Sequence, residues 1–163
     1  MASLLEDIKK QSEWTVKAFE VDGYKLDYSI HSLIEIDRFF QKNVVNGKPK
    51  KGGRLIKDLG GIIFSISSYI AETIIQNVPK SELITNDDDP DGEINFTVKL
   101  PNGVYFFPAQ RVMKRFKNGL EDAIYPYAYE LTKPYVLNIF DQTFWEIGKE
   151  IEVKEKSKPW WRF

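Results

Sequence analysis

The stretch Arg54–Asn77, RLIKDLGGIIFSISSYIAETIIQN, decides the fold. Its apolar residues recur every three or four positions, which is the spacing of one face of an α-helix. That face is formed by Leu55, Leu59, Ile62, Ile66, Tyr69 or Ile70, and Thr73, and it is widened by Ile56, Ile63, Ile70 and Ile74. A face this wide predicts a central helix that other elements cover on most sides, ending at Pro79.

Two glycines interrupt this predicted helix. Gly60 and Gly61 each cost about 1 kcal/mol relative to alanine inside a helix. Glycine is found inside helices despite this cost where another backbone has to come close. The pair therefore predicts a close approach near the start of the helix.

The remaining sequence predicts further helices around a small β part. Before the central helix, we expect helices over Leu4–Phe19 and from Ser29 or Ser32 to about Lys42, then a polar loop over 46–53. After it, we expect strands over 81–85, 94–100 and 104–107, with a turn at 101–103, and helices over 109–116, from Leu120 and over 134–149. This order predicts an α+β fold that is mostly helical, with a central buried helix and a small antiparallel β-hairpin packed against helices.

The composition excludes several classes of protein. The chain has 163 residues, the size of one domain, and no cysteine, which rules out disulfides, cysteine–zinc sites and cysteine nucleophiles. Its net charge of −1 argues against general nucleic-acid binding, which needs an excess of positive charge. The first residues lack the pattern of a signal peptide, and the longest uncharged stretch, 59–71, is too short to cross about 30 Å of hydrocarbon. We therefore expect a single cytoplasmic domain, 1–163, without a transmembrane segment and with an irregular tail over 152–163.

The stretch 86–96, NDDDPDGEINF, is the densest group of carboxylates in the chain. Three of its aspartates and one glycine match the start of a calcium-binding loop: Asp87, Asp89, Asp91 and Gly92. Position twelve of that loop needs a bidentate glutamate, and here it is Val98. We expect a solvated turn, with weak calcium binding as the alternative.

His31 is the only histidine, which makes a histidine-based metal site improbable, since such sites use two or three. It lies in the predicted first turn of the second helix, so we expect a surface or boundary histidine rather than a catalytic base. No nucleotide-binding motif is present, and we expect no cofactor and no metal.

Two groups of basic residues are the candidate binding site for an anion or a partner. The first precedes the central helix and the second follows the β part: Lys48, Lys50, Lys51, Arg54 and Lys57, and Arg111, Lys114, Arg115 and Lys117. Glycine amides, a helix N-terminus and cations together suit a phosphate or carboxylate, while a solvated basic loop is the plain alternative. If the two groups meet in space, an acidic partner surface is favoured.

Two further features are candidates for pairing or docking. Glu72 lies within the apolar central helix, where a carboxylate is often paired, and we expect Arg115 as its partner. Trp160 and Trp161 belong to an aromatic tail that docks on the body of the protein or binds a partner or a membrane surface.

Several short elements follow one another in a recognisable order. They are Asp27-Tyr28-Ser29, Ser32-Leu33, Ile36-Asp37, Phe39, Gly52-Gly53, Leu55, Leu59-Gly60, Tyr69, Glu72, Pro108, Val112, Lys114-Arg115-Phe116, Asn118-Gly119 and Asp122. This order resembles a group of small uncharacterised bacterial cytoplasmic proteins, catalogued as a domain of unknown function, over about residues 27–125. The resemblance implies a bacterial source and no established enzyme activity, and it supplies no catalytic residues.

The sequence therefore favours a non-enzymatic protein that binds a protein partner, as an inhibitor or immunity-type protein does. A homo-oligomer stays open. The alternative is a protein that binds a small anion or ligand, or an enzyme, with Arg54, Lys51 and Glu72 placed around the Gly52-Gly53 turn. Convergence of those side chains in one concave site would favour the alternative.

Overall fold

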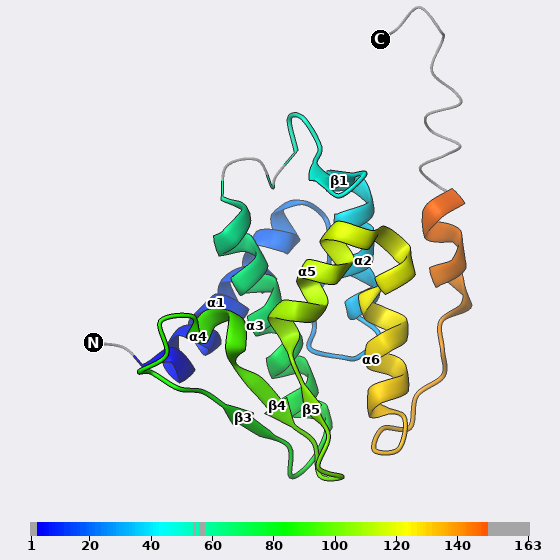
Figure 1. Ribbon diagram of the computed structural model, residues 1–163. Helices are drawn as coiled ribbons and strands as arrows, with labels where there is room; N and C mark the ends of the chain where they lie inside the picture. The colour runs from blue at the N-terminus through cyan, green and yellow to red at the C-terminus, as the bar shows by residue number, and fades with distance from the viewer. Residues whose placement is uncertain (1–2, 54, 56–57, 150–163) are drawn as a thin grey trace, which may run out of the picture.

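The computed structural model describes residues 3–53, 55 and 58–149 (Figure 1). It has the predicted mostly helical α+β fold. The helices are α1 (Leu4–Val21), α2 (Leu33–Asn43), α3 (Leu59–Asn77), α4 (Gly92–Asn95), α5 (Pro108–Asn118) and α6 (Ile124–Thr132). The strands are β1 (Val44–Val45), β2 (Lys48–Pro49), β3 (Glu82–Ile84), β4 (Thr97–Lys99) and β5 (Tyr105–Phe106). Two 3₁₀ turns, η1 (Gly119–Asp122) and η2 (Gln142–Glu146), follow α5 and α6.

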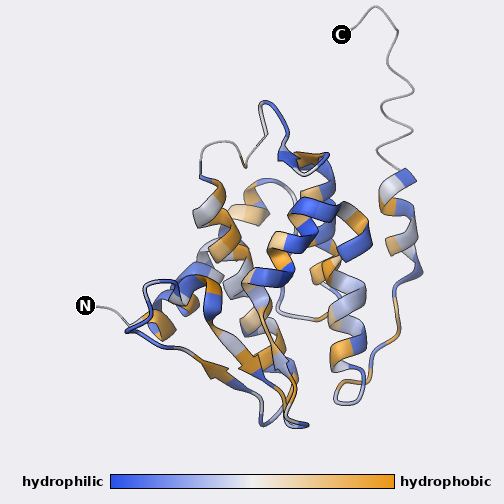
Figure 2. Cartoon of the chain, viewed as in Figure 1, coloured by the Kyte–Doolittle hydropathy of each residue, from blue (hydrophilic) through white to orange (hydrophobic). Residues whose placement is uncertain are grey.

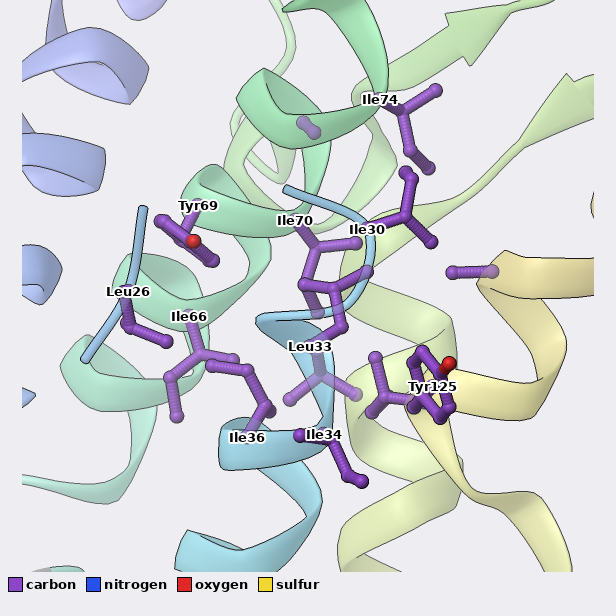
Figure 3. Packing of buried hydrophobic residues seen from close by; sticks show 14 of the residues in the cluster. Leu26, Ile30, Leu33, Ile34, Ile36, Ile66, Tyr69, Ile70, Ile74 and Tyr125 are labelled. Atoms are coloured by element: carbon purple, nitrogen blue, oxygen red, sulfur yellow. The ribbon is translucent and has the colours of Figure 1, made fainter. Parts of the chain in front are cut away.

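Helix α3 lies at the centre of the molecule, as its apolar pattern predicts. Ile66, Tyr69 and Ile70 have no exposed surface, and Figure 3 shows Ile66 and Ile70 beside Ile36 and Leu33 of α2. Helix α1 lies along α3, and α5 also contacts it. Helix α3 is long and apolar enough to cross a membrane, a criterion that the core helix of a soluble protein also meets, and half of its apolar window is buried inside this fold.

The two glycines of α3 have a different role from the predicted one. A Cβ on Gly60 would have nothing within 4 Å, so no backbone approaches there. A Cβ on Gly61 would lie 2.4 Å from Oδ2 of Asp58, the residue whose carboxylate accepts a hydrogen bond from the Gly61 N–H and caps the helix. The expectation of a close backbone contact was wrong, since the space at Gly61 is taken by the cap.

The three-stranded sheet has the order β3-β4-β5, with both pairs antiparallel. Gly103, at a φ of +86°, forms the predicted turn between β4 and β5. The β4 segment was expected to begin at residue 94, but 92–95 form the short helix α4 and the strand begins at Thr97.

The region after α6 also differs from its prediction. Residues 136–141 form no regular structure, and within the predicted range 134–149 only η2 and residues 147–149 are helical. The apolar residues at helical spacing, such as Phe140 and Phe144, pack as a group of aromatic rings against Tyr125 of α6. Residues at helical spacing can therefore be buried by packing between aromatic rings, without forming a helix.

Candidate partner-binding site

The polar loop expected over 46–53 begins as a two-stranded hairpin, β1-β2. Asn46 and Gly47 form its turn, with φ values of +52° and +72°. Positive φ at both central residues defines a tight turn that favours the Asn-Gly dipeptide. That dipeptide is visible in the sequence and would have predicted the hairpin. Figure 2 shows hydrophilic residues in the part of the hairpin after β1 and at the adjoining end of α5, whereas β1 itself is hydrophobic.

Gly47 brings this hairpin onto the C-terminal end of α5. A Cβ on Gly47 would lie 3.0 Å from the backbone oxygen of Lys117, closer than side chains normally come. Glycine is therefore required here both for its positive φ and for the close contact. This contact joins the first basic group of the sequence to the second.

A first recess, about 320 Å³ in volume, lies between the hairpin and the end of α1. Its lining includes three lysine side chains, those of Lys42, Lys50 and Lys51, and the Gly52-Gly53 turn. One carboxylate, that of Asp22, also lines it. The cations outnumber the carboxylate, so the recess has a positive potential.

A second recess, about 610 Å³ in volume, lies between the hairpin and α5. Lys50 lines it from the hairpin and Lys117 lines it from α5. Lys50 also lines the first recess, so the two recesses adjoin at this residue. One exposed lysine of each basic group, Lys50 and Lys117, therefore lines the second recess.

We call the lysines of this area the basic hairpin face: Lys42, Lys48, Lys50, Lys51 and Lys117. All five are exposed. Within residues 3–53, 55 and 58–149, none of them forms an ion pair. Their charges are therefore available to an outside molecule.

Arg115 does not belong to this face, although its sequence position suggested it. It is 1% exposed, and its Nε donates to Oδ1 of Asp37 at 2.8 Å. A second guanidinium nitrogen donates to the backbone oxygen of Asp37 at 3.0 Å. The predicted Glu72–Arg115 pair is thus wrong, because Arg115 pairs with Asp37 of α2, whereas the charges that act on Glu72 are those of α1.

Asp37 also caps helix α6. Its two carboxylate oxygens accept hydrogen bonds from the backbone N–H groups of Ile124 and Tyr125, at 2.9 and 2.8 Å. Those N–H groups belong to the first turn of α6, which lacks a side-chain cap of its own. Burial raises the pKa of Asp37, while the Arg115 guanidinium and the two amides lower it. The pair is a structural connection between α2, α5 and α6.

Glu72 lies apart from the Gly52-Gly53 turn. It is half-buried on α3, burial raises its pKa, and the charges acting on it are those of Lys9 and Glu13 on α1. The first recess instead meets the end of α1 at Asp22, which lies about 14 Å along the helix from Glu13 and about 20 Å from Lys9, at 1.5 Å per residue. Lys51 and Glu72 therefore do not converge on one site.

Arg111 points away from the basic hairpin face. Its guanidinium lies 3.8 Å from the centre of the Tyr127 ring, and it is 3.4 Å from a carboxylate oxygen of Asp122. These contacts use its charge within the molecule. Arg54, Trp160 and Trp161 lie outside the described residues.

His31 is exposed, as expected, but the sequence gave no sign of its partner. Its Nε2 lies 2.6 Å from Oδ2 of Asp141, a residue 110 positions further on. Hydrogen bonds from Thr143 and from His31 lower the pKa of Asp141 to about 2. Among the described residues no hydroxyl group bonds to the His31 ring, and the Thr143 hydroxyl beside the pair donates to Oδ1 of Asp141.

The acidic stretch is a turn whose carboxylates cap nearby backbone. Asp89 accepts hydrogen bonds from the Asp91 N–H and the Asn95 side chain, which lower its pKa. Asp87 accepts one from the Leu4 N–H at the start of α1, where a negative charge stabilises the helix. In the part of the chain that the structure describes, no three acidic or histidine side chains are grouped to hold a metal.

The chain matches no protein-family model, no curated protein and no solved structure. The resemblance over residues 27–125 to a domain of unknown function stays a prediction.

Proposed function

We propose that this protein binds an acidic surface of a protein partner through the basic hairpin face and catalyses no reaction. The observation that carries the proposal is the meeting of the two basic segments: Lys50 and Lys117 line one recess, and Lys50 lines the neighbouring one with Lys42 and Lys51. Cytoplasmic location belongs to the same proposal, as does an inhibitor-like role, in which the protein covers its partner.

The energetic case rests on unpaired charge. An exposed lysine loses little by staying hydrated, so unpaired lysines alone do not stabilise a fold. Grouped on one face, however, they create a positive potential that attracts an acidic surface and speeds association. The net charge of the whole chain is −1, so the positive area is local.

The lining of the recesses favours a macromolecular partner over a small ligand. Pockets for small molecules are mostly apolar, with a few placed polar groups. Charged residues make up half of the lining of the first recess, three lysines and one aspartate among eight residues. Such a surface suits hydrated contacts with carboxylates of a protein.

The experiment is affinity capture from the source cell with a charge-reversed bait. The variant carries Lys50→Glu and Lys51→Glu, and the matched control carries Lys10→Glu and Lys17→Glu, two exposed lysines of α1. We expect a protein that copurifies with the wild type and the control at 50 mM NaCl, is lost with the variant, and weakens at 300 mM NaCl. Equal capture by all three baits contradicts the proposal, and so does a partner removed by nuclease.

Binding of a small anion is a second candidate function, favoured by the convergence of Lys42, Lys50 and Lys51 on one recess. It is tested by thermal shift with inorganic phosphate and with ATP. A ligand at 100 times its dissociation constant stabilises the folded state by about 2.7 kcal/mol. A shift that the Lys50→Glu and Lys51→Glu changes abolish would support this candidate.

A further inference from the structure

Strand β5 lies at one edge of the three-stranded sheet, and no described strand pairs with its outer side (Figure 1). The Leu100 N–H donates to the Val104 backbone oxygen at 2.8 Å, so these two residues form a hydrogen-bonded pair of the antiparallel ladder. The next pair, Lys99 and Tyr105, is therefore of the alternate type, whose backbone groups point away from the partner strand. Phe107 continues the extended backbone, with a φ of −109° and a ψ of 93°. The N–H and C=O of Tyr105 are thus open to an added strand.

The side chains beside this edge line one small recess. Tyr105 is 49% exposed and Phe107 is 40% exposed, and residues two apart in an extended segment point to the same face of a sheet. Both line a recess of about 90 Å³ together with Tyr127 of α6 and with Arg111 and Lys114 of α5. Sites for small molecules are usually about 300–1,000 Å³ in volume. A recess this small therefore suits one side chain of a longer ligand.

Lysine side chains lie close to the Tyr105 ring. The Lys99 ammonium nitrogen is 5.8 Å from the centre of that ring, and exposed Lys114 lines the recess from α5. Glu82 lies opposite Lys99 on β3. Within the ranges 3–53, 55 and 58–149, neither lysine forms an ion pair. A ligand that brings carboxylates to this edge supplies the opposite charge that both lysines lack.

We propose that the β5 edge binds an extended acidic segment of a protein partner, which adds to the sheet as a further antiparallel strand. Its backbone pairs with the N–H and C=O of Tyr105, a mode of recognition in which main-chain hydrogen bonds give affinity and alternate side chains give specificity. The residue opposite Tyr105 points its side chain to the same face as that ring. An acidic side chain at this position lies on the face that carries Lys99 and Tyr105.

Charge favours this occupant over a second copy of the protein. A contact between two copies is self-complementary, so each β5 edge would bring its two lysines against those of the other copy. Like charges brought together in this way oppose association. Charge also favours β5 over β3, the other edge of the sheet, since β3 leads into the aspartates of the stretch 86–96, which repel an acidic segment.

The probe for this site is a fluorescein-labelled peptide of six residues in which glutamate and valine alternate. Its counterpart has lysine in place of glutamate, and fluorescence anisotropy at 50 mM NaCl measures the binding of both. We expect saturable binding of the acidic peptide and binding of the basic one that is weaker by about tenfold or more. Lys114→Glu should weaken the acidic peptide by about tenfold. The matched control is the variant with Lys50→Glu and Lys51→Glu on the basic hairpin face, which should bind it unchanged.

Backbone pairing is tested on the peptide itself, so the result does not depend on whether a variant folds. In an added antiparallel strand, the residue opposite Tyr105 donates its own N–H to β5. With glutamates on the face of Tyr105, N-methylation of the glutamates removes these donors and should weaken binding by about tenfold. N-methylation of the valines, whose N–H groups point away from β5, should leave binding nearly unchanged.

Four results overturn the proposal. They are the lack of saturable binding by the acidic peptide, equal affinities of the two methylated peptides, loss of binding with the Lys50/Lys51 variant in place of Lys114→Glu, and a homodimer in sedimentation velocity that the acidic peptide dissociates. The third would place the peptide on the basic hairpin face, and the fourth would assign the β5 edge to a second copy. The recess at β5 shares no lining residue with the two recesses of the basic hairpin face, so the proposed function stands or falls separately.

Discussion

Arg115 and Lys117 lie two positions apart on α5, and the fold gives them opposite roles. Arg115 is 1% exposed and held by Asp37, whereas Lys117 is exposed and lines a recess. A buried charge is tolerated only when a partner and hydrogen bonds replace its hydration, so Arg115 is committed to the fold. An exposed charge costs the fold little and is left for recognition. The comparison separates structural charge from available charge.

The largest effect is expected from Arg115→Met. The change leaves Asp37 buried with only the two amides of α6 as donors. Removing one partner of a buried ion pair costs about 3–5 kcal/mol. The free energy of unfolding, measured by urea denaturation, should fall by that amount. Lys117→Met is the control and should stay within about 0.5 kcal/mol of the wild type. Equal losses of unfolding free energy for Arg115→Met and Lys117→Met would show that the two cations do not differ in their structural role.

The next effect tests a charge of intermediate burial, that of Asp141. Its pKa is about 2 in the folded protein, below its ordinary value of 3.8. A lowered carboxyl pKa stabilises the folded state above pH 4, and this stabilisation is lost as the pH falls from about 4 to about 2. We expect Asp141→Asn to cost at most about 2 kcal/mol at pH 7, with the difference from the wild type vanishing near pH 2.

Urea denaturation at a series of pH values measures that difference. His31→Gln is the companion variant, and it should remove only part of the stabilisation, because hydrogen bonds from Thr143 also lower the pKa of Asp141. A difference between Asp141→Asn and the wild type that persists unchanged at pH 2 would mean that the carboxylate charge is not the cause.

A smaller effect is expected from Gly47→Ala, which acts on the junction between the two basic segments. Its φ of +72° and the 3.0 Å approach to the Lys117 backbone oxygen both exclude a side chain. We expect a cost of about 1–2 kcal/mol, since a positive φ alone costs an L-residue about that much. Gly52 has a φ of +79° and nothing within 4 Å of an added Cβ, so Gly52→Ala should lose stability only through its backbone conformation.

The difference between these two alanine variants therefore isolates the close approach. Gly47→Ala should also weaken binding of the captured partner, although it changes no lysine, because it shifts Lys48 and Lys50 relative to Lys117. Equal stability of the two variants, with binding unaffected, would show that the contact with α5 does not hold the basic hairpin face together.

Local patterns were enough to predict α1, α2, α3 and α5 and the central position of α3. Apolar periodicity over 59–77 reflects burial on several sides, and burial is what the structure shows there. The hairpin β1-β2 was equally available from its Asn46-Gly47 dipeptide. Local sequence also indicated four of the five lysines of the candidate site, whereas Lys42, at the end of α2, was not among the candidates.

Long-range pairings were not predictable in the same way. Asp37 and Arg115 are 78 positions apart, and His31 and Asp141 are 110 apart, so no spacing rule connects them. The expected Glu72–Arg115 pair failed for this reason: several carboxylates competed for one arginine, and packing of α2 against α6 decided between them. Whether a basic residue is structural or available depends on that packing.

The smallest effect is expected from Lys48→Gln, at the margin of the basic hairpin face. Lys48 is exposed on β2 and is not among the residues that line the two recesses. Its removal should change the unfolding free energy by less than about 0.5 kcal/mol. A charge at the rim of an interface acts mainly through long-range attraction, so we expect a lower association rate for the captured partner and an unchanged dissociation rate.

Surface plasmon resonance at 50 and 300 mM NaCl measures both rates, and the association difference should shrink at the higher salt concentration, where the screening length is shorter. A changed dissociation rate would instead show that Lys48 contacts the partner directly, so that the contact area extends toward the tip of the β1-β2 hairpin.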